Sequence, residues 1–209
     1  TGTPLTVMHS IDRPGMGQIY QLVSDLLGEA PIAWHLFAWA VRAAGGLAFL
    51  WLARMLWPGQ TLATTLMAVL YAVYAGFLQQ PSANNYSNHL LAYSASIFSL
   101  ALTVRAVRSP RWPAKIILFL PALAAAYWYP RVYEAMVGVE ALRFILIWYA
   151  LRGEPAHGFW KCAGKSLLWF TPFLLVAGYF IYYRVFIFES QRMSVDAESL
   201  LAQYSQNNN

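Results

Sequence analysis

Four ionisable side chains that could act together chemically fall within one short stretch of this sequence. Residues 127–143, which read YWYPRVYEAMVGVEALR, place Arg131 and Glu134 between two apolar runs and Glu140 and Arg143 inside the second run. An ionisable group within an apolar, hydrocarbon-facing segment is energetically costly, so it indicates either a function or a specific internal pairing. The stretch therefore holds both candidate reactive groups and a candidate buried ion pair.

Asp12 and Glu134 are the candidate catalytic residues. A carboxylate beside a hydrophobic cavity can accept a proton from an acceptor hydroxyl as a general base. It can also hold a divalent cation that neutralises a leaving phosphate. The simpler alternatives are a helix-capping carboxylate for Asp12, which precedes Arg13-Pro14, and a solvated loop charge for Glu134.

Arg42, Glu140 and Arg143 are the candidate buried charges. Glu140 and Arg143 are three residues apart and therefore share one face of a helix. Arg42 lies about 15 Å along the first apolar run, and the other two lie about 8 and 12 Å along the fifth. Glu140 can thus pair with Arg143, with Arg42 or with both. The group predicts either an ion pair that locates two helices or a cation site for an anionic head group.

His35 is the candidate ligand for a haem or a chlorophyll-type magnesium, because a histidine in a membrane helix can take that role. No second histidine sits at a matching depth on another apolar run. We therefore expect His35 to be a hydrogen-bonded histidine near the membrane surface rather than a pigment ligand. The single cysteine, Cys162, excludes an intrachain disulfide and a multi-cysteine metal site.

The composition indicates the class of protein. Of the 209 residues, 59% are hydrophobic and 11% are charged, whereas soluble chains carry roughly 25% charged residues. The nine Trp and thirteen Tyr suit membrane–water interfaces. The net charge of +5 does not predict nucleic-acid binding, because the basic residues are dispersed among short connectors. We expect an all-α, polytopic helical membrane protein.

The elements that must position these residues follow from the apolar pattern. Residues 1–30 are too polar to cross a bilayer, but residues 16–27 place apolar side chains on one face at helical spacing, which predicts an amphipathic helix lying on a membrane surface. Residues 31–188 contain six apolar runs that we interpret as spanning helices, each needing roughly 20 residues. A polar tail, residues 189–209, follows. The predicted spans are Ile32–Leu56, Leu62–Leu78, Leu90–Val107, Ile116–Tyr129, Ala135–Leu151 and Leu167–Phe188.

The basic residues predict the orientation, because short loops rich in Lys and Arg stay in the cytoplasm. Eight basic residues occur in three connectors, against one, Arg131, in the two connectors of the opposite side. We therefore expect residues 1–30 and 189–209 on the outer face of a bacterial inner membrane. The basic connectors are 54–61, 105–115 and 152–166, and the outer ones are 79–89 and 130–134.

The segments DRPGMGQIY, AWHLFAWAVR and LQQPSANNYSNH resemble uncharacterised bacterial polytopic membrane proteins. In general shape the chain resembles the type C membrane glycosyltransferases, which use polyprenyl-phosphate-linked sugars. In that family the first outer loop carries a catalytic acidic residue and amphipathic helices, and Asp12 with the helix at 16–27 occupies the matching place. The resemblance, which is diffuse and covers most of the chain, also implies lipid-phosphate contacts for Arg13 and Arg131.

We therefore expect a membrane-embedded glycosyltransferase-like protein, or a fragment of one, that handles a lipid-phosphate-linked sugar at the outer face. The alternative is a non-catalytic structural subunit of a larger membrane complex, whose buried charges serve packing. Membrane lipids are expected partners in both cases, with a lipid-linked sugar in the first and other membrane subunits in the second. An enzyme predicts one cavity lined by Asp12, Arg131 and Glu134, whereas a scaffold predicts that these groups are scattered.

Overall fold

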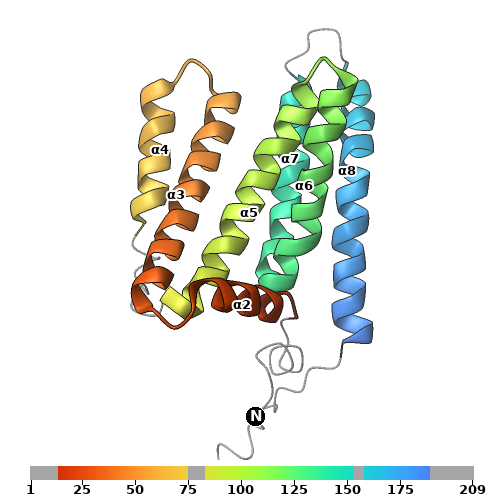
Figure 1. Cartoon of the computed structure of the whole chain (residues 1–209). Helices are drawn as coiled ribbons and strands as arrows, with labels where there is room; N and C mark the ends of the chain where they lie inside the picture. The colour runs from red at the N-terminus through yellow and green to blue at the C-terminus, as the bar shows by residue number, and fades with distance from the viewer. Residues whose placement is uncertain (1–13, 75–82, 153–157, 189–209) are drawn as a thin grey trace, which may run out of the picture.

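A computed structural model describes residues 14–74, 83–152 and 158–188, and all regular structure within these ranges is helical. The predicted all-α class is therefore confirmed. One helix lies across an end of the molecule and the others run alternately up and down beside one another (Figure 1). The α-helices are α2 (Pro14–Leu27), α3 (Pro31–Leu56), α4 (Thr61–Val73), α5 (Ala83–Arg108), α6 (Trp112–Val132), α7 (Val139–Arg152) and α8 (Phe159–Tyr182); a 3₁₀-helix η3 (Glu134–Gly138) and a π-helix η4 (Tyr183–Ile187) complete the set.

Three of the described helical segments are long and apolar enough to cross a membrane. They are Pro31–Leu56, Tyr86–Arg108 and Phe159–Ile187, and Thr61–Val73 is a shorter apolar helix. In hydrocarbon every backbone polar group must be satisfied within the chain, and an α-helix does this without help from neighbours. These helices indicate a helical membrane protein.

Each of the six apolar runs forms a helix, but several predicted bounds differ from those observed, most clearly in three places. The segment Ala83–His89 had been assigned to a polar loop, yet it forms the first turns of α5. Its Ser87 and Asn88 are buried against the bundle, so hydropathy alone could not identify it as helix. The fifth run begins with the 3₁₀-helix η3, and α8 begins eight residues before the predicted Leu167. The start of α8 contains two lysines, whose long stems can carry the charge to water at a helix end.

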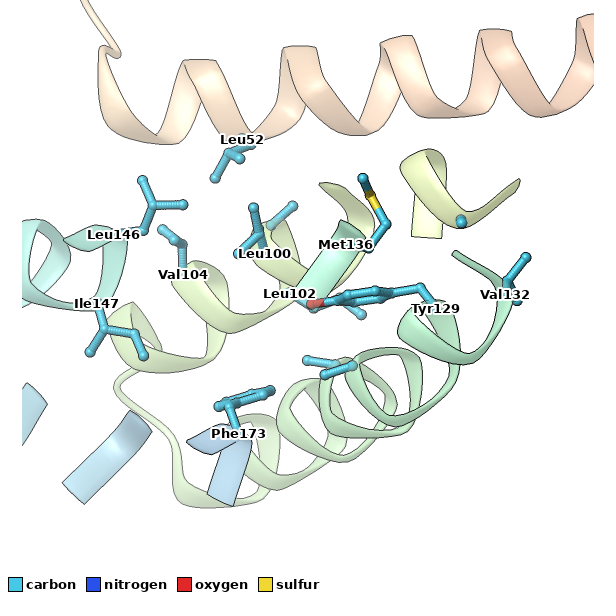
Figure 2. Close-up of a cluster of buried hydrophobic side chains, with 14 of the residues drawn as sticks. Leu52, Leu100, Leu102, Val104, Tyr129, Val132, Met136, Leu146, Ile147 and Phe173 are labelled. Carbon is cyan, nitrogen blue, oxygen red and sulfur yellow. The ribbon is translucent and has the colours of Figure 1, made fainter. Parts of the chain in front are cut away.

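Helix α5 is the centre of the bundle and packs against α3, α6 and α7. Its buried face carries small side chains, which let the neighbouring backbones approach closely. Ser94 Oγ donates a hydrogen bond of 3.0 Å to Val41 O on α3, and Ser99 Oγ donates one of 2.6 Å to Ala122 O on α6. Figure 2 shows Leu100, Leu102 and Val104 of the same helix within the apolar cluster.

Gly45 is a point of close approach between α3 and α5. A Cβ added there would lie 3.1 Å from Ser94 Cβ and 2.9 Å from the Tyr71 hydroxyl. Since α4 supplies Tyr71, one glycine allows three helices to meet.

The amphipathic helix predicted at residues 16–27 is present as α2, and its apolar face packs on the end of the bundle. Met16, Ile19 and Val23 are buried, while Leu22 and Leu26 are exposed. Helix α2 contacts α6 and α5, crossing below their ends in Figure 1. Gly28, with a φ of 63°, ends this segment and turns the chain into α3.

The basic residues of the connectors gather at the end of the bundle opposite to α2, which we call the basic end (Figure 1). Helices α3, α5 and α7 finish there and α6 and α8 begin there. The described basic residues of this end are Arg54, Arg105, Arg108, Arg111, Lys115, Arg152, Lys161 and Lys165.

We expect Gly45→Ala to lower the stability by about 1–3 kcal/mol, because the added methyl group overpacks the α3–α5 contact. Thermal unfolding of the purified protein in detergent measures the change. Gly164→Ala in α8 is the matched control, because a Cβ there meets nothing within 4 Å. An unchanged melting temperature for Gly45→Ala would show that the contact is looser than described.

Candidate functional site

Arg143 is the most completely buried charged residue among those described, with 0% of its surface exposed. It lies on α7 one turn after Glu140, which is 6% exposed. Arg143 Nε donates to Glu140 Oε2 at 2.6 Å, and Nη2 donates to Glu140 Oε1 at 3.1 Å. The two side chains form a bidentate ion pair on one helix, as their three-residue spacing permits.

The remaining donors of Arg143 are taken by neighbouring helices. On α5, Ser99 accepts at Oγ (2.9 Å) and at its backbone oxygen (3.3 Å), and Thr103 Oγ1 accepts from Nη1. On α6, Tyr129 OH accepts from Nη2 at 3.2 Å and donates to Glu140 Oε1. The guanidinium carbon also lies 4.0 Å from the centre of the Phe173 ring of α8. All partners come from the protein itself, so the arrangement locates helices and leaves no donor directed at a ligand.

Arg42 does not belong to this ion pair. Its Nη2 donates to the backbone oxygen of Tyr74 at the end of α4, at 3.1 Å. The predicted grouping of Arg42 with Glu140 and Arg143 is therefore corrected. Glu140 and Arg143 pair with each other on α7, whereas Arg42 connects α3 to the end of α4. Similar depth in two helices had suggested the contact, but depth carries no information about which faces meet.

Tyr74 lines a cavity of about 600 Å³ between α4 and α5, which we call the tyrosine cavity. His89 lies in its wall, with its ring 4.8 Å from that of Tyr133 and 5.4 Å from that of Tyr86. The other lining residues are Leu70, Tyr71, Leu90 and Tyr93.

Arg131 and Glu134 line a second cavity, of about 350 Å³, at the end of the bundle opposite to the basic end. We call it the Arg131 cavity. The last turn of α6, the start of η3, the start of α2 and the last turns of α8 with η4 form its walls. Its lining residues are Gly15, Gln18, Tyr127, Trp128, Pro130, Arg131, Glu134, Tyr179, Phe180, Tyr183, Arg184 and Phe188.

The electrostatics of the Arg131 cavity come from two guanidinium groups and one carboxylate. Arg184 Nη2 lies 3.6 Å from Glu134 Oε1, and both side chains remain about a quarter to a third exposed, at 26% and 30%. The Arg131 guanidinium carbon lies 3.5 Å from the centre of the Tyr127 ring, and its Nη1 donates to the Tyr127 backbone oxygen. Stacking on the Tyr127 ring holds the Arg131 guanidinium at the cavity wall, and a guanidinium is a group that binds anions in a planar geometry.

Asp12 and Arg13 lie outside the described residues, so the structure assigns them no position. Their neighbour Gly15 does line the Arg131 cavity, and a Cβ added to it would lie 2.8 Å from the Arg131 backbone oxygen. Helix α2 therefore begins in close contact with the end of α6. The structure brings together Arg131 and Glu134 with the start of the segment that follows Asp12.

His35 is exposed on the first turns of α3. Across residues 14–74, 83–152 and 158–188, no three His, Cys, Asp or Glu side chains form a group that could hold a metal ion. A divalent cation at the Arg131 cavity would therefore need ligands besides Glu134. They would come from residues outside these ranges or from a substrate.

Sequence reasoning missed the contribution of α8 and η4 to the Arg131 cavity. Tyr179, Tyr183 and Arg184 had been read as part of an apolar span. The sequence feature that could have identified them is the run GYFIYYRVF at residues 178–186. It places three tyrosines and an arginine at the same end of the bundle as Arg131. Such polar-tipped aromatics mark the interfacial end of a membrane helix.

The helices and this site define the class as a helical membrane protein with a basic, aromatic-lined cavity at one end. Comparison of the chain with protein-family models, with curated proteins and with solved structures found no match.

We expect Arg143→Met to lower the stability by about 3–5 kcal/mol, because it leaves the Glu140 carboxylate buried without its partner. The double substitution Glu140→Leu with Arg143→Met should restore much of this loss, since no buried charge then remains. Thermal unfolding in detergent measures both. Arg152→Gln, an exposed arginine of the same helix, is the control, and an equal effect of Arg152→Gln and Arg143→Met would contradict the interpretation.

Proposed function

We propose that the protein is a glycosyltransferase-like membrane protein that binds a polyprenyl-phosphate-linked sugar at the Arg131 cavity. The observation that carries the proposal is the convergence of Arg131, Arg184 and Glu134 on one aromatic-lined cavity at the end of the bundle where α2 lies. The resemblance to type C glycosyltransferases supports the same assignment.

The chemistry of the cavity fits a lipid phosphate. Arginine binds phosphate through charge-assisted hydrogen bonds in a planar, bidentate geometry. Arg131 and Arg184 line the same cavity from two elements, α6 and η4, so we expect both to contact a phosphate bound there. The rings of Tyr127, Tyr179 and Phe180 give the same cavity the apolar and aromatic surface that a sugar ring or the first isoprene unit packs against.

The reaction we propose is transfer of the sugar from the lipid phosphate to an acceptor hydroxyl. The hydroxyl oxygen forms a bond to the anomeric carbon, and the bond from that carbon to the phosphate oxygen breaks. The electron pair leaves with the polyprenyl phosphate, and the guanidinium groups stabilise the charge on it. The carboxylate of Asp12 or of Glu134 takes the proton of the hydroxyl. Gly15, three residues after Asp12 in the sequence, lines this cavity.

We further propose that α3 to α8 are six spanning helices, with α2 at the outer surface of a bacterial inner membrane. The gathering of basic side chains at one end supports this orientation, because Lys and Arg favour the cytoplasmic side. Leu22 and Leu26, exposed on α2, then face the lipid interface. In this orientation the Arg131 cavity opens to the outer face.

The second candidate function is a non-catalytic subunit of a larger membrane complex. The exposure of the last helical segment favours this function, because few residues of the span Phe159–Ile187 are buried within the bundle. Three large apolar residues of α8 are mostly exposed: Trp160 at 83%, Leu168 at 74% and Leu175 at 67%. Lipid or another chain could cover this surface, and the binding experiment below separates the two functions.

We expect the purified chain in nanodiscs to bind a long-chain polyprenyl phosphate. Arg131→Gln and Arg184→Gln should each weaken binding by about tenfold, equivalent to about 1.4 kcal/mol, because each removes a charge-assisted hydrogen bond to the phosphate. Binding can be measured by native mass spectrometry or by titration with a fluorescent polyprenyl phosphate.

Arg111→Gln is the matched control, an exposed arginine at the basic end that should leave binding unchanged. The catalytic step is tested with membranes containing a polyprenyl-phosphate-linked hexose, by following release of polyprenyl phosphate. Asp12→Asn or Glu134→Gln should abolish release while binding persists. Undetectable binding and release by the unaltered chain would reject the enzyme and favour the structural subunit.

The orientation can be tested by cysteine labelling in intact cells. Cys162 is buried and is first replaced by Ser. In that background, Glu29→Cys should react with a membrane-impermeant maleimide from outside, because it lies at the end where α2 packs. Gln60→Cys, in the turn between α3 and α4, should react only after the cells are permeabilised. The opposite labelling pattern would invert the proposed topology.

A further inference from the structure

The guanidinium of Arg131 lies close to aromatic rings of two helices. Its central carbon is 3.5 Å from the centre of the Tyr127 ring on α6, its own helix. The ring centres of Tyr179 and Phe180, on α8, lie 5.8 and 6.0 Å from the same carbon. A cation within about 6 Å of a ring centre is attracted by the ring electrons, and the attraction is strongest at short distance. Tyr127 is therefore the main aromatic partner of Arg131.

Tyr127 makes two separate contacts with Arg131. The two residues are four apart on α6, so their side chains lie on one face of the helix. Besides the ring contact, the backbone oxygen of Tyr127 accepts a hydrogen bond from Arg131 Nη1. An arginine side chain has many rotamers, and restraining it before a ligand arrives lowers the entropy lost on binding. The ring and the hydrogen bond together supply such a restraint.

The type of contact matters for a residue that binds phosphate. An aromatic ring contacts the face of a guanidinium, whereas a carboxylate contacts its N–H groups. The N–H groups are also the groups through which an arginine binds phosphate. The Tyr127 ring therefore restrains Arg131 through a surface that a bound phosphate does not need. Arg184 differs, because its Nη2 lies 3.6 Å from Glu134 Oε1.

We propose that Tyr127 is a positioning residue for lipid-phosphate binding, whose ring places the Arg131 guanidinium for contact with the phosphate. The inference rests on the function proposed for the Arg131 cavity and adds a residue that acts through Arg131. Because the contact is made by the ring, the phenol hydroxyl of Tyr127 has no part in it.

The test is a double-mutant cycle on the full chain in nanodiscs, with a fluorescent polyprenyl phosphate as the probe. Tyr127→Leu should weaken binding about fivefold, the effect expected for loss of one cation–π contact. Tyr127→Phe should bind as the unaltered chain does. In the Arg131→Gln background, Tyr127→Leu should cause no further loss, because the group that the ring positions is gone.

An equal loss from Tyr127→Leu in both backgrounds would overturn the proposal, since the ring would then act by contacting the ligand directly or by supporting the fold. Equal losses in Tyr127→Phe and Tyr127→Leu would also overturn it, because the hydroxyl and not the ring would carry the effect. Tyr127 is 48% exposed, so its replacement should leave the fold intact, and the melting temperature of each variant checks this.

Tyr182→Leu is the matched control. Tyr182 is a tyrosine at the last residue of α8, is 55% exposed and does not line the Arg131 cavity, so its variant should keep full affinity. Binding that Tyr127→Leu leaves unchanged would reject this inference and keep the proposed function. Undetectable binding by the unaltered chain would reject both.

Discussion

The arrangement of the bundle depends on the ion pair and hydrogen bonds that the buried guanidinium of Arg143 makes. A charge in a low-dielectric interior is tolerated only when it is paired and its donors are satisfied. Glu140 supplies the charge, Ser99 and Thr103 bring α5, and Tyr129 brings α6. Each hydrogen bond therefore also specifies which helix lies beside α7 and in which register, whereas apolar contacts alone would accept several registers.

Close packing around α5 complements this polar centre. Without a large hydrophobic driving force between helices in lipid, association relies on van der Waals contact and interhelical hydrogen bonds. Gly45 lets the backbones of α3 and α5 approach closely, and the hydroxyls of Ser94 and Ser99 donate to carbonyl oxygens of α3 and α6. Helix α5 takes part in both, through Ser99 and Thr103 in the buried network and through Ser94 in the contact with α3, so it holds the frame against which the other helices are placed.

Helices α6 and α8 each contribute to cavities at both of their ends. At one end Arg131 of α6, Tyr179 of α8 and Arg184 of η4 line one cavity; at the basic end Lys115 of α6 and Lys165 of α8 line another. Both sites combine positive side chains with aromatic rings and open beside apolar helix surfaces. At the Arg131 cavity this combination suits an amphiphilic molecule with a phosphate, the chemical class of the proposed substrate.

The sequence by itself determined the helical membrane class, the six helical runs and the shared face of Glu140 and Arg143. Composition, apolar run length and a three-residue spacing are local properties, and the backbone in lipid has few other solutions. Helix bounds were less certain wherever polar residues are buried, as at Ser87, or lysines begin a helix, as in α8. Only the tertiary structure decided that Arg42 reaches Tyr74 instead of Glu140, and that Arg184 joins Glu134. In a membrane helix almost every face is apolar, so hydrophobic periodicity cannot show which faces meet; that depends on long-range hydrogen bonds and close contacts between residues far apart in the chain.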